Sequence, residues 1–231
     1  MRVFQWSLSM DILSMHETID IINSSLRNSE SIQHIVVNAA KIVNAQKDFD
    51  LRSAINDSDI VNVDGMAVVW ALRLLGHKIH ERVSGIDLFD QLLELSYANK
   101  YKPYFLGATE EINKLMLSKI KSKYPGMEIA GARHGYFSAA EEILIVDKIK
   151  ASKPDMLFIG ISSPRKEEFI NKYFDDMNIP FVMGVGGSFD VCAGSTKRAP
   201  IWMQKNGLEW LFRIYQEPKR MGKRYLRTNT I

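Results

Sequence analysis

Short runs of β-forming residues alternate along most of this chain with longer segments that have a helical period. Several of the runs end directly in glycine, asparagine or aspartate, and they cover residues 35–37, 60–63, 103–106, 127–130, 156–159 and 181–183. A strand–helix alternation of this kind predicts an α/β fold, with a mostly parallel sheet and helices on both of its faces.

The helical segments carry their own start signals. One follows Asp64-Gly65 and is predicted over 66–75, while Thr109 and Ser138 precede glutamate pairs as N-cap residues. Pro164 is expected in the first turn of another helix. The side chains predicted to face the core are Ile112, Leu115, Met116 and Ile120 after Thr109, Ile143, Val146 and Ile149 after Ser138, and Phe169, Ile170 and Tyr173 after Pro164.

Charge is distributed unevenly along the 231 residues. The stretch 197–231 holds nine lysines and arginines and two acids, so it carries +7 although the whole chain carries only +3. After the Ala199-Pro200 step the same stretch mixes aromatic and aliphatic with basic residues, which predicts one or two amphipathic helices broken near Pro218. We therefore expect a core over 1–198 and a basic amphipathic helical appendage over 199–231.

An anionic membrane surface is the expected partner of this appendage, since basic residues beside an apolar face favour the headgroup region of a bilayer. The alternative is that the apolar face packs on the core or on another subunit, and a homo-oligomer is left open. No nucleic-acid module accompanies the basic residues, so nucleic acid is not an expected partner.

The cellular compartment is indicated by what the sequence lacks. The single cysteine, Cys192, excludes an internal disulfide framework and fits a reducing compartment. Asp11 comes too early for a secretory apolar stretch, and no run approaches the roughly 20 apolar residues that span a bilayer. We expect a cytoplasmic protein that is soluble or peripheral at a membrane.

Ligands of open α/β sheets bind outside the carboxyl ends of the strands, so the residues that follow the runs are candidate site residues. Asp64 follows the run 60–63 and precedes a glycine. A carboxylate in such a crevice can accept a proton from an attacking hydroxyl. The alternative is that Asp64 only caps the next helix.

Arg82 lies in the segment Glu81-Arg82-Val83-Ser84-Gly85-Ile86-Asp87. Its planar guanidinium suits a phosphate and keeps its charge at neutral pH. The alternative is a surface ion pair with Glu81 or Asp87.

A glycine-rich turn follows the run 181–183, with Gly184, Gly186 and Gly187 ahead of Asp190. Bare backbone N–H groups there could approach a diphosphate closely, although glycines also serve tight turns alone. The spacing matches neither the dinucleotide fingerprint nor a Walker A loop.

No histidine, cysteine or aspartate cluster with metal-ligand spacing occurs, so neither a metal site nor another cofactor is predicted. The start of the segment 163–168 places Arg165 and Lys166 in a first helical turn, against the dipole, which hints weakly at a ligand. A solvated helix start is the alternative there.

Taken together in order, the motifs resemble the WecG/TagA/CpsF family of bacterial glycosyltransferases over nearly the whole chain. The matching segments are VNAAK from Val37, VDG from Val63, ERVSGIDL from Glu81, FLG from Phe105, GYF from Gly135, SPxxE from Ser163, GVGGxxD from Gly184, RAP from Arg198, GLEWLxR from Gly207, EPxR from Glu217 and RY from Arg224.

This resemblance implies a Rossmann-like core and an inverting, metal-independent transfer that needs no cofactor. It implies a UDP-sugar donor and an undecaprenyl-diphosphate-linked sugar as acceptor, in making teichoic acid linkage units, enterobacterial common antigen, capsule or O-antigen. It also implies that the appendage reaches the inner face of the cytoplasmic membrane and helps to complete the active site.

The resemblance also assigns roles to residues. Asp64 matches the proposed catalytic base and Arg82 an arginine that engages the diphosphate. The other candidates are Asn38, Gly107, Gly160, Lys166, Glu167, Gly184, Gly186, Gly187 and Asp190 for the donor, and Arg198, Arg213, Arg220 and Arg224 for the acceptor or the appendage.

Three positions depart from the family pattern. Lys166 replaces a usual glutamine, His134 an aspartate before Gly-Tyr-Phe, and Val36 a threonine. We expect these departures to bear on the transferred sugar, which stays open between an N-acetylmannosamine type and a glucose type. A non-enzymatic membrane adaptor of a polysaccharide assembly complex and a Rossmann oxidoreductase are the alternative functions.

Overall fold

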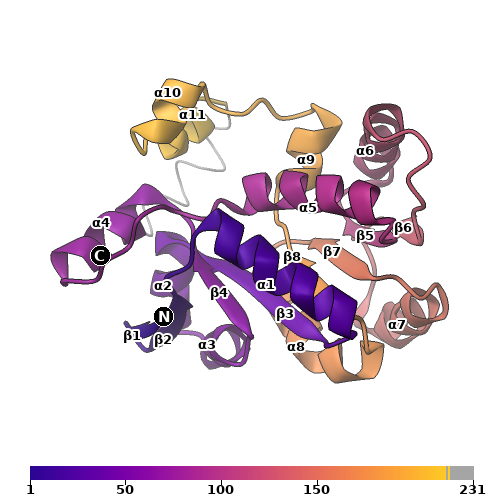
Figure 1. Ribbon diagram of the computed structural model, residues 1–231, viewed down its shortest axis with the longest axis horizontal. Coiled ribbons are helices and arrows are strands. Elements are labelled where there is room, and N and C mark those ends of the chain that lie inside the picture. The colour runs from indigo at the N-terminus through magenta and orange to yellow at the C-terminus, as the bar shows by residue number, and fades with distance from the viewer. Residues whose placement is uncertain (217, 219–231) are drawn as a thin grey trace.

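A single eight-stranded sheet with helices on both faces forms the body of the protein (Figure 1), in a computed structural model that describes residues 1–216 and 218. In chain order the elements are β1 (Arg2–Gln5), β2 (Leu8–Asp11), α1 (Met15–Asn28), β3 (Ile32–Val37), α2 (Ala39–Ala45), α3 (Phe49–Asn56), β4 (Ile60–Val63), α4 (Met66–Leu74), α5 (Gly85–Asn99), β5 (Pro103–Gly107), α6 (Glu110–Lys123), β6 (Gly131–Arg133), the 3₁₀ turn Ala139–Glu141, α7 (Glu142–Ala151), β7 (Met156–Gly160), α8 (Arg165–Met177), β8 (Phe181–Gly184), α9 (Ser188–Ala193), α10 (Ile201–Lys205) and α11 (Glu209–Gln216).

The strand order is β1-β2-β4-β3-β8-β7-β5-β6. All neighbouring strands are parallel except β1 and β2, which form an antiparallel hairpin at one edge. The predicted α/β fold with a mostly parallel sheet is therefore confirmed.

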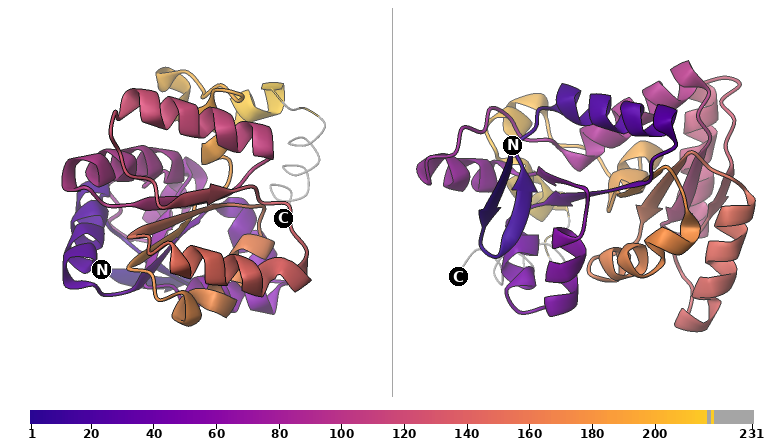
Figure 2. Two further views of the ribbon diagram at one scale, coloured as in Figure 1. Left: turned by 90° about the vertical axis from the view of Figure 1, so that its right-hand side faces the viewer. Right: turned by 60° about the horizontal axis from the view of Figure 1, so that its bottom comes forward.

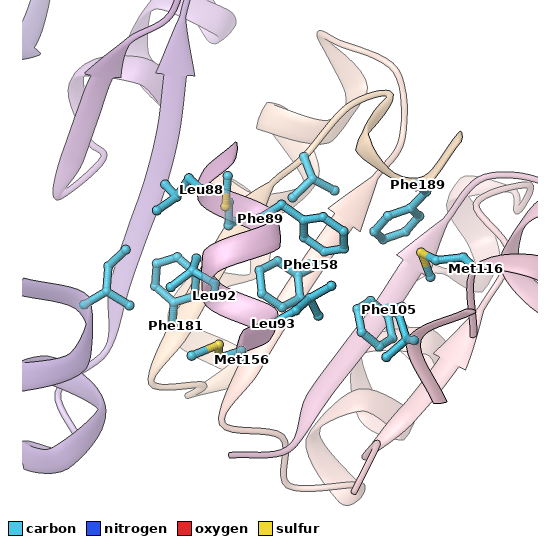
Figure 3. Close-up of a cluster of buried hydrophobic side chains, with 14 of the residues drawn as sticks. Leu88, Phe89, Leu92, Leu93, Phe105, Met116, Met156, Phe158, Phe181 and Phe189 are labelled. Atoms are coloured by element: carbon cyan, nitrogen blue, oxygen red, sulfur yellow. The ribbon is translucent and has the colours of Figure 1, made fainter. Parts of the chain in front are cut away.

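One face of the sheet is covered by α1, α5, α6 and α9. Figure 3 shows Leu88, Phe89, Leu92 and Leu93 of α5 lying over Phe105, Phe158 and Phe181 of three strands, with Phe189 of α9 beside them. Phe89 packs edge-on against Phe158, with 5.0 Å between the ring centroids. Each such fully buried side chain stabilises the fold by roughly 1.5–3 kcal/mol.

The other face is covered by α2, α3, α7 and α8, as the sheet seen edge-on in Figure 2 makes plain. Along β7, Met156 and Phe158 pack on the first face, and Leu157 and Ile159 pack on the second. Side chains alternate between the faces of a strand, so a strand buried on both sides is apolar throughout.

The sequence predicts where these helices start more accurately than it predicts which of their side chains face the core. Thr109 caps α6 by accepting a hydrogen bond from the backbone N–H of Ile112, as predicted. Leu115 was expected in the core but is 52% exposed, because buried Asn113 and Met116 set the inward face of α6. The amide of Asn113 donates hydrogen bonds to backbone carbonyls of β5 and β6.

Helix α7 shows a similar shift of its inward face. Ser138, predicted as an N-cap, forms a capping box with Glu141 at the 3₁₀ turn before α7, and Val146 and Ile149 are buried as expected. Ile143 is 63% exposed, because the buried stripe runs through Ile145 instead. The expected core residues of α8, Phe169, Ile170 and Tyr173, are all buried.

The strand predicted over 127–130 is wrong. The chain approaches β5 there only at Ala130, whose N–H bonds the carbonyl of Pro103, and the paired residues are Gly131 to Arg133 of β6.

The basic stretch begins with two helices, α10 and α11, which are separated at Gly207. The break predicted near Pro218 borders residues outside the described part of the chain and stays a prediction. Gly207 has φ +69, and a Cβ there would meet Met66 and Trp70 of α4, so the turn packs tightly on that helix. Trp202, Trp210 and Leu211 are exposed, so the alternative that the apolar face packs on the core is not seen at these three side chains. Lys219, Arg220 and Arg224 lie outside the described residues.

The described part of the chain contains no helix long and apolar enough to cross a bilayer. The division into a core over 1–198 and an appendage over 199–231 stays a prediction.

Candidate functional site

The carboxyl ends of the parallel strands bring most of the predicted donor-site residues to one edge of the sheet. Val37 and Val63 are register partners in β3 and β4, so the residues after them, Asn38 and Asp64, are neighbours. Gly184 ends β8 on the other side of β3, and Gly160 and Gly107 end β7 and β5 beyond it. The helix after β3 and the helix after β8 cover opposite faces of the sheet, which opens a crevice at this edge.

Asp64 lies in this crevice with its side chain 26% exposed. Its backbone N–H bonds the carbonyl of Val37, which fixes it beside β3. The cap position of α4 is taken by Gly65, with φ +96 and no side-chain cap hydrogen bond. The alternative prediction that Asp64 caps this helix is therefore wrong, and its carboxylate is available for chemistry.

Arg82 is held beside Asp64 by the backbone. The N–H of Val83 bonds the carbonyl of Val63, and the side chain of Val83 is buried in the core. The guanidinium Nη1 of Arg82 consequently lies 3.7 Å from Oδ1 of Asp64. The pairing of these two residues, predicted from two separate motifs, is seen directly.

The alternative partners predicted for Arg82 are engaged elsewhere. Glu81 accepts the backbone N–H of Met15, and Asp87 pairs with Arg198. An ion pair between Arg82 and either acid is therefore not formed.

Glu209, the first residue of α11, is the partner of Arg82 that the sequence did not single out. Both terminal nitrogens of Arg82 donate to Oε2 of Glu209 at 3.1 Å, and Oε1 of Glu209 lies 3.5 Å from Nη2 of Arg213. The carboxylate of Glu209 thus contacts both arginines and brings Arg213 to the site. The only hint in the sequence was the position of Glu209 inside the motif that also contains Arg213.

The charges around Asp64 alter its affinity for a proton. Burial raises the pKa of Asp64, the positive charge of Arg82 opposes this, and the negative charge of Glu209 adds to it, so that the pKa ends above its ordinary value. A carboxylate with a raised pKa is a stronger base.

A polar pocket of about 280 Å³ adjoins these residues. Arg198 spans it and donates to both carboxylate oxygens of Asp87, at 2.7 Å for Oδ2. This pairing lowers the pKa of Asp87 although burial alone would raise it. Charged and polar residues of four segments line the pocket, among them Gly187, Asp190, Lys197, Arg198, Glu209 and Arg213.

The glycines at the strand ends divide into two groups. A Cβ on Gly107 would lie 2.5 Å from the backbone of Gly160, one on Gly160 would strike the ring of Phe189, and one on Gly184 would strike the Lys166 side chain. A side chain at any of these three positions would clash with a neighbouring residue, which explains why each is a glycine. Gly186, with φ +54, and Gly187 have open space where a Cβ would stand, which leaves their backbone accessible to a ligand.

Lys166 and Glu167 lie beneath the strand ends rather than in the crevice. The Glu167 carboxylate, fully buried, lies 2.9 Å from Nζ of Lys41 and 3.3 Å from Nζ of Lys166. The two lysines outweigh the opposing effect of burial and lower the pKa of Glu167 to about 2. The solvated helix start considered for this segment is therefore wrong, and a ligand would meet little of either side chain directly.

Three further candidates have local partners. Asn38 caps α2 by accepting the N–H of Lys41, and Val36 lies under Gly85 at the start of α5. His134 is remote from Asp64 along the sheet, where its Nδ1 receives the backbone N–H of Tyr136. Arg220 and Arg224 fall outside the described residues.

On the side of α4 an open groove of about 370 Å³ reaches Arg82. Its walls come from α4, from the segment between α4 and α5, and from α10, through Met66, Val69, Arg73, Arg82, Ile201 and Gln204. Within the residues that the structure describes, no group of three or more histidine, cysteine, aspartate or glutamate side chains is placed to hold a metal ion.

Comparison with known proteins agrees with this geometry. A sequence profile described as the Glycosyl transferase WecG/TagA/CpsF family matches residues 3–231. The chain belongs to this family of glycosyltransferases. Membership confirms the resemblance drawn from the motifs and makes the protein an enzyme.

Two curated relatives in the family carry the name N-acetylglucosaminyldiphosphoundecaprenol N-acetyl-beta-D-mannosaminyltransferase. The one from Bacillus subtilis (strain 168) is 36% identical over 176 residues, which is 76% of this chain and 68% of the relative. The one from Staphylococcus aureus (strain MW2) is 32% identical over 218 residues, which is 94% of this chain and 85% of the relative.

Proposed function

We propose that this WecG/TagA/CpsF-family enzyme transfers a sugar from a UDP-sugar to an undecaprenyl-diphosphate-linked sugar, with inversion, during synthesis of a cell-surface polymer. The observation that carries this proposal is the contact of Asp64 with Arg82 at the carboxyl edge of the sheet, 3.7 Å apart. A base and a fixed cation side by side are what a displacement at an anomeric carbon requires.

The reaction is a single displacement. The oxygen of the acceptor hydroxyl forms a bond to the anomeric carbon, while the bond from that carbon to the UDP oxygen breaks and its electron pair leaves with UDP. Asp64 takes the proton of the hydroxyl. Because the bond forms on the side opposite the leaving group, the configuration inverts.

The leaving diphosphate gains negative charge in the transition state, and Arg82 is the nearest cation to Asp64 that can stabilise it. We place the donor diphosphate in the polar pocket, beside Gly187, Arg198 and Arg213. The open backbone at Gly186 and Gly187 supports this placement, since N–H groups there can approach phosphate oxygens closely.

The roles of Asn38, Asp190, Gly107, Gly160 and Gly184 in donor binding stay proposals. Lys166 and Glu167 would act from below, by holding α2 and α8 under the crevice.

Both relatives are named for moving an N-acetylmannosaminyl group to N-acetylglucosaminyldiphosphoundecaprenol, so UDP-N-acetylmannosamine is the first donor to test here. The place of action would be the inner face of the cytoplasmic membrane.

A panel of UDP-sugars tests the proposal. Each is offered with a prenyl-diphosphate-linked N-acetylglucosamine, and UDP release and the anomeric configuration of the product are measured. We expect release with one N-acetylated or neutral hexose donor, only when acceptor is present, and in the presence of EDTA. Retention of configuration, or release from no donor, would contradict the proposal, and a loss in EDTA that magnesium restores would contradict metal-independent transfer.

A further inference from the structure

The groove between α4 and α10 differs in chemistry from the polar pocket. Arg82 lines the groove and Glu209 lines the polar pocket, so the ion pair between these two side chains stands where the two spaces meet. The volume of about 370 Å³ lies in the range of small-molecule sites, roughly 300–1,000 Å³. We name this space the α4–α10 groove.

Three of the polar side chains that line the α4–α10 groove are engaged within the protein, and exposed His80 lines the groove beside them. Arg73 donates to the backbone carbonyls of Ile79 and His80, at 2.9 and 2.8 Å. Glu81 accepts the first backbone N–H of α1, and Gln204 donates to the carbonyl just before Pro200. What these groups leave for a ligand is mainly the apolar surface of the groove.

That apolar surface continues onto the outside of the molecule. Met66 of α4 and Ile201 of α10 line the groove, where Ile201 is 69% exposed and Val69 is buried beneath the surface. Trp70 and Leu74 follow Met66 at four-residue spacing and are 48% and 88% exposed. An apolar strip therefore runs from Arg82 along α4 to the surface.

We propose that the α4–α10 groove binds the first isoprene units of the lipid-linked acceptor, with the acceptor's diphosphate at the end of the groove that Arg82 lines, so that Arg82 stands between this diphosphate and the donor diphosphate in the polar pocket. A ligand with an anionic head and an apolar chain is the chemistry that satisfies both ends of this groove. A nucleotide sugar would leave the exposed apolar surface of Ile201 and of half-buried Met66 without an apolar ligand against it. The inference rests on the proposed function and adds to it a site for the lipid.

Exposed tryptophans on the two helices that flank the groove agree with this occupant. Trp70 on α4 and Trp202 on α10, both exposed, have the amphipathic rings that favour the boundary between lipid headgroups and acyl chains. A chain that leaves the groove between them would enter a bilayer directly. The core helix α4 would then face the membrane together with the basic stretch.

Binding of prenyl diphosphates to the full-length protein tests the inference without requiring turnover. Geranyl, farnesyl and geranylgeranyl diphosphate are titrated below their micelle-forming concentrations, with inorganic pyrophosphate as the head alone. We expect affinity to rise with chain length. In Ile201→Asp we expect a loss of about tenfold or more for geranylgeranyl diphosphate and an unchanged affinity for pyrophosphate.

Ile143→Asp is a matched control for the Ile201→Asp variant. Ile201 and Ile143 are both exposed isoleucines in the first turn of a helix, α10 and α7, where an aspartate is favoured by the helix dipole. Both variants should therefore fold. Ile143→Asp should bind every ligand as the wild type does, and Ile201→Leu should restore the chain-length dependence.

Three results would overturn the inference. They are affinity independent of chain length in the wild type, an equal loss of pyrophosphate binding in Ile201→Asp, and a change of molar mass in solution between the wild type and Ile201→Asp. The last would mean that a second copy of the chain covers the groove. Length-dependent binding without UDP release from any donor would instead contradict the proposed function.

Discussion

Asp64 is surrounded by charges of both signs that come from distant parts of the chain. Arg82 follows it by 18 positions and is fixed through Val83. Glu209 and Arg213 come from the first turns of α11, and both act on the pKa of Asp64, in opposite directions. The basicity of the proposed catalytic group is therefore set by α11 as well as by the strand that carries it.

Replacing Asp64 by asparagine removes the base and keeps its size. We expect the fold to persist and turnover to fall by roughly 100-fold or more, since general base catalysis contributes that much. UDP release and the thermal unfolding midpoint are the measurements. Asp20→Asn, an exposed change on α1, is the control, and near-normal turnover of Asp64→Asn would remove Asp64 from its role.

Glu209→Gln removes a negative charge that raises the pKa of Asp64. In the wild type, activity should be lost with falling pH as Asp64 takes up a proton, at a pH above the ordinary value for aspartate. The variant should lose activity at a lower pH, because Asp64 then faces Arg82 and Arg213 without an opposing carboxylate. The acidic limb of kcat/KM against pH measures this.

Glu209→Asp keeps the charge and serves as the control for that shift. An acidic limb that stays in place, or moves to higher pH, in Glu209→Gln would show that the carboxylate does not act on Asp64.

At the level of elements, a buried charge cluster joins the two helices under the crevice. Lys41 of α2 bonds the carbonyl of Val36 with its Nζ at 2.7 Å and lies 2.9 Å from Glu167 of α8. Lys166 approaches the same carboxylate from α8 itself. One carboxylate thus ties β3 and α2 to α8 below the proposed donor site.

Glu167→Gln should destabilise the fold by about 3–5 kcal/mol, because two buried ammonium groups lose their counter-charge. The pKa of Glu167 is about 2 in the fold and ordinarily 4.5. Its contribution is therefore complete above pH 4.5 and is lost as the pH falls toward 2. Urea midpoints measured at neutral and acidic pH should differ less in the variant than in the wild type.

Glu168→Gln, one residue along α8 and exposed, should change stability by less than about 0.5 kcal/mol. Equal stability of the two variants would mean that the buried carboxylate does not hold these helices together.

Sequence signals located some elements and missed others for physical reasons. The runs 60–63, 156–159 and 181–183 are buried on both faces and, apart from Asn62, apolar, and they were found because that pattern is typical of central parallel strands. The hairpin of β1 and β2 was missed because its turn is Trp6-Ser7, with φ +51 and +61. A two-residue turn of this shape is usually marked by Asn-Gly or Asp-Gly.

The residues of the candidate site were likewise predicted from the sequence only in part. Asp64 and Arg82 follow strand and motif signals in the sequence, so they were predicted as neighbours. Glu209 was not, because helical periodicity does not indicate which residue of α11 returns to the core. The burial of Lys166 and Glu167 was also missed, because charged residues in a first helical turn are usually solvated.

At the scale of the whole molecule, the candidate site joins the sheet to the C-terminal basic stretch. The described helices α10 and α11 contact α4 at Gly207 and Arg82 at Glu209. The remaining basic residues, Lys219, Arg220, Lys223, Arg224 and Arg227, lie outside the described residues, and their contact with a membrane is predicted from the sequence alone.

Deleting residues 219–231 removes five basic residues and no acidic one. Each basic residue near an anionic leaflet adds about 1 kcal/mol to binding, so the deletion should sharply reduce both partition to anionic vesicles and transfer to a lipid-linked acceptor. Vesicle sedimentation and UDP release measure the two effects. Neutral vesicles are the control, and unchanged partition to anionic ones would exclude this segment as the anchor.

The bridge from Arg82 to Glu209 spans 127 positions of sequence. During translation, Asp64 and Arg82 emerge long before the helix that supplies their third charged neighbour. A nascent chain that has folded its sheet would therefore hold the proposed donor pocket with one wall missing, and the enzyme should gain its activity only when α11 has left the ribosome and docked.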